Sequence, residues 1–386
     1  MATNWRTKLI HSNSDVPQGF RSLVTPTYRG STTLFKNAAS VRDDWRQEVA
    51  PYTYGSHGTP TTLELGARIA ELEKGVWTFI TPGGQSAIAL IYLAFVGAGD
   101  HILVPDSAYG PSRDLAQHLM RRFRIEVDFY DPLIGLAIER LIKPHTQLIW
   151  CESPGSVTME VQDVPAIADA AHGHSVTVAL DNTYAAGIYL DAFACGVDVT
   201  MQSLTKYVGG HSDLVLGSVT VRDRKHYEAV GAVHQHLGLV ASPDECALAL
   251  RGMKTLGVRL REIEQSALSI ARWLRTRPEI DRVLHPALPS CLGHDTWRRD
   301  FTGSAGVFSV VFEARIAKEK IVAFVDALQL FKIGYSWGGV TSLAMPHFSL
   351  IRSGDGYHDR LVRLSIGLEA TDDLIADLDQ AFARIG

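Results

Sequence analysis

The sequence is poor in cysteine, with only four among its 386 residues, at positions 151, 195, 246 and 291. They lie far apart and form no Cys-x-x-Cys motif, so we expect neither disulfides nor zinc, and a reducing cytoplasm fits. Histidine is more frequent, at 15 residues. Its closest clusters, His172–His174 and His234–His236, have no carboxylate or cysteine at standard ligand spacing, so the sequence predicts no metal site.

Long apolar runs and an excess of one charge are also missing. No stretch approaches the roughly 20 apolar residues that span a bilayer, and the N-terminal MATNWRTKLIHSNSD lacks the apolar core of a signal peptide. The 37 basic and 42 acidic residues give a formal charge of −5, which does not indicate a nucleic-acid partner. With 46% hydrophobic and 20% charged residues, the composition is typical of a folded soluble protein of enzyme size. We expect neither a membrane nor a nucleic-acid partner.

Short apolar runs alternate with helical patterns between residues 61 and 250. VWTFI (76–80), HILVP (101–105) and VTVALD (176–181) are examples of the runs. This alternation predicts βαβ units, and hence a large α/β domain with a mostly parallel sheet. Residues 251–386 combine helical patterns with two strand candidates, GVFSVVF and RLVRLSIGL, and predict a smaller C-terminal α+β domain. Residues 1–60 are irregular and proline-containing, and we expect an arm that contacts a neighbouring subunit.

Two helices are predicted with definite ends. Leu65, Ile69 and Leu72 share one face of a helix within residues 61–75, and Gly75 marks its C-terminal end. The pattern RGMKTLGVRLREIEQSALSIARWLR predicts a second helix that opens the C-terminal domain at Arg251.

Three features fall at the carboxyl ends of predicted strands, the edge where α/β sheets bind ligands. TPGGQSAIAL (81–90) opens a helix whose N-terminus favours an anion. Asp181 ends VTVALD, and Lys206 follows VTMQSL (199–204). Each feature also has an ordinary interpretation: the glycine-rich segment can be a simple turn, Asp181 a helix cap, and Lys206 a solvated lysine. Together they suit pyridoxal 5′-phosphate, which needs an anion cradle, an acid and a lysine. The glycine-rich turns are not GxGxxG, which argues against a nicotinamide oxidoreductase.

Several motifs resemble those of the Cys/Met-metabolism family of pyridoxal-phosphate enzymes. The motifs are YGSHGTPT, DSAYGPS, DNTYAAG, SLTKYVGGHSD, YSWGG and RLVRLSIGLE. They are spread over essentially the whole chain, and YSWGG and LIADLDQAFARI are most similar to the cystathionine β-lyases of that family. The resemblance implies the aspartate-aminotransferase-like fold (fold type I), pyridoxal 5′-phosphate as cofactor, and a homotetramer with sites shared between subunits.

The resemblance also implies roles for individual residues. The cofactor would be held by Lys206, Asp181, Tyr109, Gly84, Gln85, Ser203, Thr205 and Tyr54. Of these, Lys206 would bind it covalently, Asp181 would pair with its ring N–H, and Tyr54 would reach in from the neighbouring subunit. The catalytic residues would be Lys206, Tyr109 and Tyr54. The substrate would be bound by Arg363, Ser336 and Trp337.

The chain departs from the family at one place. β-Lyases of this family commonly read Tyr-Gly-Arg-Arg, whereas Ser56 and His57 follow Tyr54 and Gly55 here. The first arginine would bind the cofactor phosphate, and the second would lie toward the distal end of the substrate. The residue that fills either role is therefore left open, with a protonated His57 as one candidate.

The implied activity is that of a carbon–sulfur β-lyase that cleaves L-cystathionine, an amino-acid substrate, into homocysteine, pyruvate and ammonia in methionine biosynthesis. The alternatives within the family are a cystathionine γ-synthase, a γ-lyase and a broad cysteine-S-conjugate β-lyase. The alternative outside catalysis is a binding protein that keeps the fold and the cofactor.

Overall fold

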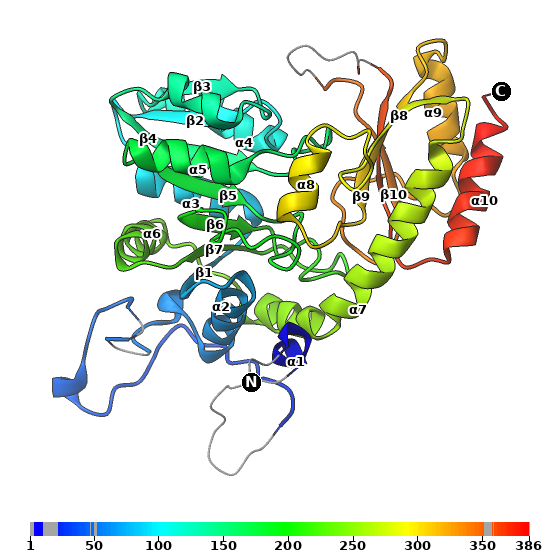
Figure 1. Cartoon of the computed structure of the whole chain (residues 1–386). Coiled ribbons are helices and arrows are strands. Elements are labelled where there is room, and N and C mark those ends of the chain that lie inside the picture. The colour runs from blue at the N-terminus through cyan, green and yellow to red at the C-terminus, as the bar shows by residue number, and fades with distance from the viewer. Residues whose placement is uncertain are drawn as a thin grey trace.

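The computed structural model describes residues 4–10, 22–46, 48–49, 52–350, 357 and 359–385. A seven-stranded sheet forms the centre of a large domain, and a four-stranded sheet forms the centre of a smaller one (Figure 1). The large sheet has the order β1-β7-β6-β5-β4-β2-β3. Its strands are β1 (Trp77–Thr81), β2 (His101–Pro105), β3 (Glu126–Tyr130), β4 (Thr146–Glu152), β5 (Thr177–Asp181), β6 (Val199–Gln202) and β7 (Gly217–Val221).

Six of the seven strands in the large sheet run in one direction. The pairs β2·β3, β2·β4, β4·β5 and β5·β6 are parallel, whereas β7 is antiparallel to both β6 and β1. Because two antiparallel steps restore the direction, β1 runs the same way as β6. The carboxyl ends of β1, β5 and β6 therefore meet at one edge, and the prediction of a mostly parallel sheet is confirmed.

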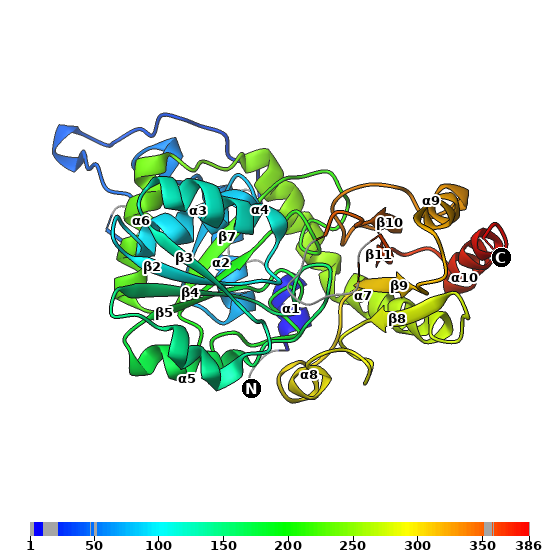
Figure 2. The ribbon, with the colours of Figure 1, turned by 90° about the horizontal axis from the view of Figure 1, so that it is seen from above.

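The strands are apolar on both faces because each face packs against helices. Ile102, Leu148 and Trp150 lie in a core with α3 (Gly84–Phe95) and α6 (Arg224–Leu237). Leu103 and Ile149, one position out of phase, lie in a second core with α2 (Pro60–Glu73) and α5 (Val164–Gly173). Figure 2 shows α3 and α6 above the sheet and α5 below it. Two short helical segments, α4 (Gly110–Asp114) and η3 (Leu115–Met120), precede β3.

The helix predicted over residues 61–75 is α2, but Gly75 acts differently from the prediction. The helix ends at Glu73, and Lys74 takes the left-handed conformation with a φ of 60°. Gly75 follows, and its N–H donates to the carbonyl of Ala70 at 2.8 Å. A Cβ on Gly75 would lie 2.3 Å from the Thr220 methyl group, so glycine is needed there for close packing.

A long helix, α7 (Pro243–Leu274), runs from the large domain to the small one (Figure 1). Met253 and Leu256 belong to the large-domain core, whereas Ile270 and Leu274 belong to the small-domain core. The predicted start at Arg251 was wrong. The helix begins at Pro243, after the Ser242 cap, and proline at the first position followed by two acidic residues is a recognised N-terminal signal. The domain division at residue 250 stays a prediction.

The small sheet is antiparallel in the order β10-β11-β9-β8. Its strands are β8 (Ile280–Leu284), β9 (Val307–Phe312), β10 (Leu343–Pro346) and β11 (Leu361–Ser365), and its helices are α8 (His294–Asp300), α9 (Lys318–Ala327) and α10 (Thr371–Phe382). In β11, Val362 and Leu364 pack against the α9 and α10 side, whereas Leu361 packs into the large-domain core. Because side chains alternate along a strand, Arg363 faces the large domain.

The N-terminal segment lies largely outside the regular structure. Its described part contains one α-helix, α1 (Trp5–Ile10), which buries Leu9 and contacts α7. The described part of the chain between residues 22 and 59 projects from the large domain, as the blue trace in Figure 1 shows. Leu23 and Leu34 on it are 93% and 90% exposed. Its predicted contact with a neighbouring subunit stays a prediction. Over the described residues, no helix is long and apolar enough to cross a membrane, and no metal-binding group of side chains gathers.

Candidate active site

Lys206 lies in the turn that follows β6, at the carboxyl edge of the large sheet. Its Nζ donates a hydrogen bond to Ser336 Oγ at 2.7 Å and lies 5.4 Å from the centre of the Trp337 ring. Burial and the nearby Arg363 charge lower the pKa of Lys206 to about 8, and the Asp181 carboxylate opposes this shift. The unprotonated amine, the form that acts as nucleophile or base, is therefore more populated near neutral pH than in a solvated lysine.

Asp181 is the last residue of β5, and its carboxylate is held by neutral donors. The Thr183 N–H and hydroxyl donate to Oδ1 at 3.0 and 2.5 Å. Burial raises the pKa of Asp181, while the two Thr183 donors and the Lys206 charge act against the rise. A carboxylate buried in this way is stabilised by a cationic N–H donor, which the protonated ring nitrogen of pyridoxal phosphate would supply.

The N-terminus of α3 forms a cradle beside Ser203. Gly83 precedes the helix and no side chain caps it, so the first N–H groups of α3 can bind an anion. A Cβ on Gly84 would lie 2.8 Å from both Ser203 Cβ and Oγ, so glycine permits the close approach of helix and hydroxyl. The first N–H groups of α3 and the Ser203 hydroxyl could therefore bind the same phosphate.

Two other predicted phosphate ligands have their side chains engaged elsewhere. The Thr205 hydroxyl donates to the Leu216 carbonyl and accepts from the Leu216 N–H, both at 3.1 Å. Gln85 donates from Nε2 to the Pro111 carbonyl at 3.0 Å, and its backbone N–H, the donor that the resemblance implies for the phosphate, lies in the first turn of α3. The predicted phosphate contact of Thr205 would therefore require its hydroxyl to leave a bond that it makes here.

Tyr109 is held at the same edge through its backbone. Its N–H donates at 2.7 Å to Oε2 of Glu152, the last residue of β4, which pairs with Asp181 across the sheet. Burial, with the charges of Glu152 and Asp181, raises the pKa of Tyr109, and Arg363 opposes this. The phenol therefore stays protonated at neutral pH, the form that can donate a proton. The sequence reading missed Glu152, although a carboxylate at the end of a buried strand was a signal.

Arg363 reaches the site from the small domain. Nη2 donates to the Ser336 carbonyl at 2.9 Å, and Nε is buried without a hydrogen-bond partner among the described residues. The side chain is 8% exposed, and burial lowers its pKa to about 10, so it remains charged at neutral pH. A buried guanidinium with an unused donor is suited to bind a carboxylate through two parallel hydrogen bonds.

The YSWGG segment joins the two domains at Lys206. Ser336 has a φ of 75°, a conformation that non-glycine residues rarely adopt and that is often found at functional sites. Its hydroxyl accepts from Lys206 while its carbonyl accepts from Arg363. Gly338 has a φ of 82°, and a Cβ there would lie 3.1 Å from the Tyr207 nitrogen. The glycine thus permits Ser336 and Trp337 to approach the lysine loop.

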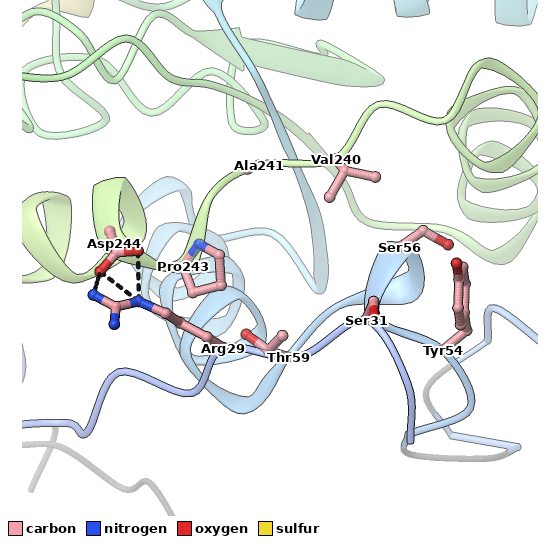
Figure 3. A pocket seen from close by; sticks show the side chains of 11 residues that line it. Arg29, Ser31, Tyr54, Ser56, Thr59, Val240, Ala241, Pro243 and Asp244 are labelled. Atoms are coloured by element: carbon pink, nitrogen blue, oxygen red, sulfur yellow. Dashed lines mark hydrogen bonds and ion pairs between the residues drawn. The ribbon is translucent and has the colours of Figure 1, made fainter. Parts of the chain in front are cut away.

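Tyr54 is not brought to Lys206 within one chain. It is 51% exposed and lines a cavity of about 440 Å³ with Arg29, Ser56 and Asp244 (Figure 3). The residues that line this cavity do not include Lys206. Its predicted role across a subunit boundary stays a prediction.

The substituted residues Ser56 and His57 face different surroundings. Ser56 borders both the cavity that Tyr54 lines and a second, largely apolar cavity with Trp45, whereas His57 borders only the second. The Thr53 hydroxyl lies 2.9 Å from His57 Nδ1 and donates to the Asp44 carbonyl. Since its one hydrogen is used in that bond, the Thr53 oxygen accepts from the Nδ1–H of His57.

Comparison with known proteins identifies the family. The model for "Cys/Met metabolism PLP-dependent enzyme" matches residues 6–383. A putative cystathionine beta-lyase of Rhizobium johnstonii is 42% identical, over 98% of this chain and 95% of that protein. Cystathionine beta-lyase MetC of Escherichia coli is 38% identical, over 98% of each chain. A crystal structure of cystathionine gamma synthase from Xanthomonas oryzae pv. oryzae superposes with a TM-score of 0.92 at 30% identity, over 100% of this chain and 99% of that one.

The chain belongs to the Cys/Met-metabolism family of pyridoxal-phosphate-dependent enzymes. The fold prediction is confirmed, since the solved structures that match share the whole architecture. Pyridoxal 5′-phosphate is therefore the cofactor, and the buried Asp181, the amine of Lys206 and the glycine cradle at α3 fit it.

Proposed function

We propose that this enzyme is a carbon–sulfur β-lyase that converts L-cystathionine and water into homocysteine, pyruvate and ammonia, in methionine biosynthesis. The names of the Rhizobium johnstonii and Escherichia coli relatives support this substrate. The observation that carries the proposal is the convergence of Lys206, Ser336 and Arg363 opposite Asp181. That arrangement can bind an α-amino acid by its carboxylate and place its Cα beside an amine.

Each residue has a defined task in this reaction. When bound, the cofactor supplies an electron sink that stabilises negative charge at the substrate Cα. Arg363 binds the α-carboxylate, with the Ser336 hydroxyl beside that carboxylate, and so orients the Cα–H bond. The neutral amine of Lys206 removes that proton. Asp181 keeps the ring nitrogen protonated, and Lys206 or Tyr109 returns a proton to the leaving sulfur.

The products from L-cystathionine test the proposal directly. We expect pyruvate and homocysteine in equal amounts. These are the products of elimination from Cβ, which needs proton removal at Cα alone. A γ-lyase would also require proton removal at Cβ and would release cysteine and 2-oxobutyrate. Chromatography of the 2-oxo acids separates the two reactions. Cysteine with 2-oxobutyrate as the main products would contradict the β-lyase proposal, and no turnover at all would favour a binding protein.

Ser56 provides a test of the proposed shared site. If Ser56 faces the cofactor phosphate of a neighbouring subunit, Ser56→Arg adds a charged hydrogen bond worth about 1.5–3 kcal/mol. The dissociation constant of the cofactor, measured by dialysis, should then fall by roughly ten-fold or more. His57→Arg is the matched control, because His57 does not border the cavity that Tyr54 and Ser56 line, and it should give no gain. Equal or weaker retention in Ser56→Arg would show that the phosphate does not face this position.

We also propose that the enzyme is a cytoplasmic homotetramer in which Tyr54 completes the site of a neighbouring subunit. The outward course of the N-terminal segment and the exposure of Leu23 and Leu34 support an arm that packs on another subunit. All four cysteines are free, which supports a reducing compartment.

A further inference from the structure

A buried carboxylate with no assigned part in the reaction lies next to the site. Glu73 is the last residue of α2 and is only 2% exposed. Asn182 donates from Nδ2 to Glu73 Oε2 at 2.9 Å, and Gln202 donates from Nε2 to Oε1. Burial raises the pKa of Glu73 to about 7, although the two amide donors act to lower it. The adjacent Lys74 pairs with Asp191 at 2.6 Å instead.

The two amides that bind Glu73 come from the ends of two neighbouring strands. Asn182 directly follows Asp181, the last residue of β5. Gln202 is the last residue of β6, four positions before Lys206. Each carboxylate oxygen of Glu73 is therefore committed to one strand, and a single side chain ties the two strand ends together.

A second chain of hydrogen bonds links the same strand ends. The Ser203 N–H donates to Thr183 Oγ1 at 2.9 Å, and the Thr183 hydroxyl donates to Asp181 Oδ1 at 2.5 Å. If the ends of β5 and β6 moved apart, these two hydrogen bonds would lengthen or pull on the Asp181 carboxylate. The Glu73 bonds oppose such a change.

The packing around Glu73 leaves it little freedom. Gly187, with a φ of 67°, covers the amide–carboxylate contact. A Cβ at this position would lie 2.9 Å from Gln202 Nε2 and 3.1 Å from Glu73 Oε1. The absence of a side chain at Gly187 therefore lets the loop after Asp181 close over the contact.

We propose that Glu73 is a positioning residue. By holding the end of β5 to the end of β6, it fixes the separation between Asp181, which pairs with the cofactor ring, and Lys206, which moves the proton. The inference rests on the proposed function, because it needs both residues to act on one bound cofactor. Glu73 acts through Asn182 and Gln202 and need not touch cofactor or substrate.

Glu73→Gln tests the proposal in the holoenzyme. Glutamine presents one acceptor and one donor, so its NH₂ group faces one of the two amide donors and one hydrogen bond is lost. Small displacements of reacting groups cost up to about 10²-fold in rate. We expect kcat to fall by roughly ten- to a hundred-fold with little change in KM, and the midpoint of the pH-dependent visible absorbance of bound pyridoxal phosphate to shift.

Two further variants separate positioning from a general structural effect. The double variant Glu73→Gln/Gln202→Glu exchanges donor and acceptor, so both hydrogen bonds can form again, and kcat and the absorbance midpoint should recover. Glu71→Gln makes the same chemical change two residues earlier on α2, where Glu71 pairs with Lys8 at 3.1 Å. This control should behave as the unmodified enzyme.

Three results would overturn the inference. One is a Glu73→Gln enzyme with the kcat and absorbance midpoint of the Glu71→Gln control. Another is a folded, cofactor-loaded double variant that stays as slow as Glu73→Gln. If Glu73→Gln does not fold, Glu73→Asp keeps the charge with a shorter reach, and normal kcat and absorbance in that variant would also overturn it. Failure of the unmodified enzyme to cleave cystathionine, with its cofactor band intact, would contradict the proposed function instead.

Discussion

Replacing Lys206 with alanine should reduce kcat for cystathionine by roughly 10²- to 10⁴-fold, the usual contribution of a positioned acid–base group. The structure gives the reason. The amine is buried, its pKa is lowered to about 8, and its Nζ hydrogen-bonds to Ser336 and lies beside the Trp337 ring, both of which are uncharged. Such an amine is neutral, and so able to act as a base and a nucleophile, far more often near neutral pH than a solvated lysine.

The variant should still fold. The folded-state pKa of Lys206 lies below the ordinary lysine value of 10.5. The folded apoprotein therefore binds fewer protons than the unfolded chain between about pH 8 and 10.5, and its stability rises with pH across that window. Below about pH 8, burying the charged amine of Lys206 opposes folding, and alanine removes that cost. At pH 7, the thermal midpoint of the variant apoprotein should therefore equal or exceed that of the unmodified apoprotein. Between pH 8 and 10.5, the midpoint of the variant should rise less than that of the unmodified apoprotein.

Reduction with borohydride locates the cofactor attachment. In the unmodified enzyme, the label should map to the peptide that contains Lys206, and the Lys206→Ala protein should retain no label. Lys225→Ala, a change of an exposed lysine on α6, is the control and should keep both label and activity. A label on another lysine, or full activity of Lys206→Ala, would contradict the assignment.

The large-domain half of the site could be predicted from the sequence because its geometry follows from local rules. Parallel strands place their carboxyl ends at one edge, so Asp181 and Lys206 had to meet once β5 and β6 were recognised. The contact of Lys206 with Ser336 spans 130 residues and two domains. No periodicity predicts such a contact, because the docking of the small sheet sets it. Only the family resemblance indicated it.

Other features were missed for physical reasons. The strand β8, IDRVL, has two adjacent charged residues, and β10 has four residues and ends in a proline, so their patterns are weak. Glu73 is the last residue of an amphipathic helix, where a carboxylate is ordinarily solvated. It becomes buried only because Asn182 and Gln202, each more than 100 residues away in sequence, close over it.

Arg363 should account for much of the affinity for the substrate carboxylate. Losing one partner of a buried charge pair costs about 2–5 kcal/mol, which corresponds to roughly 30-fold to more than 10³-fold in kcat/KM. We expect Arg363→Leu to fall in this range. Arg363→Lys should recover only part of the loss, because an ammonium keeps the charge but lacks the planar fork that meets a carboxylate through two bonds.

The matched control for Arg363 lies three residues earlier. Arg360 precedes β11 and contacts Asp281 at 3.3 Å and the Phe312 carbonyl at 2.8 Å, so Arg360→Lys should leave kcat/KM unchanged. A cystathionine analogue in which a hydrogen replaces the α-carboxylate should react equally slowly with the unmodified enzyme and with Arg363→Leu, because neither can form the carboxylate contact. Undiminished kcat/KM for cystathionine in Arg363→Leu would show that another group holds the carboxylate. The unused Nε donor of Arg363 would then need a different explanation.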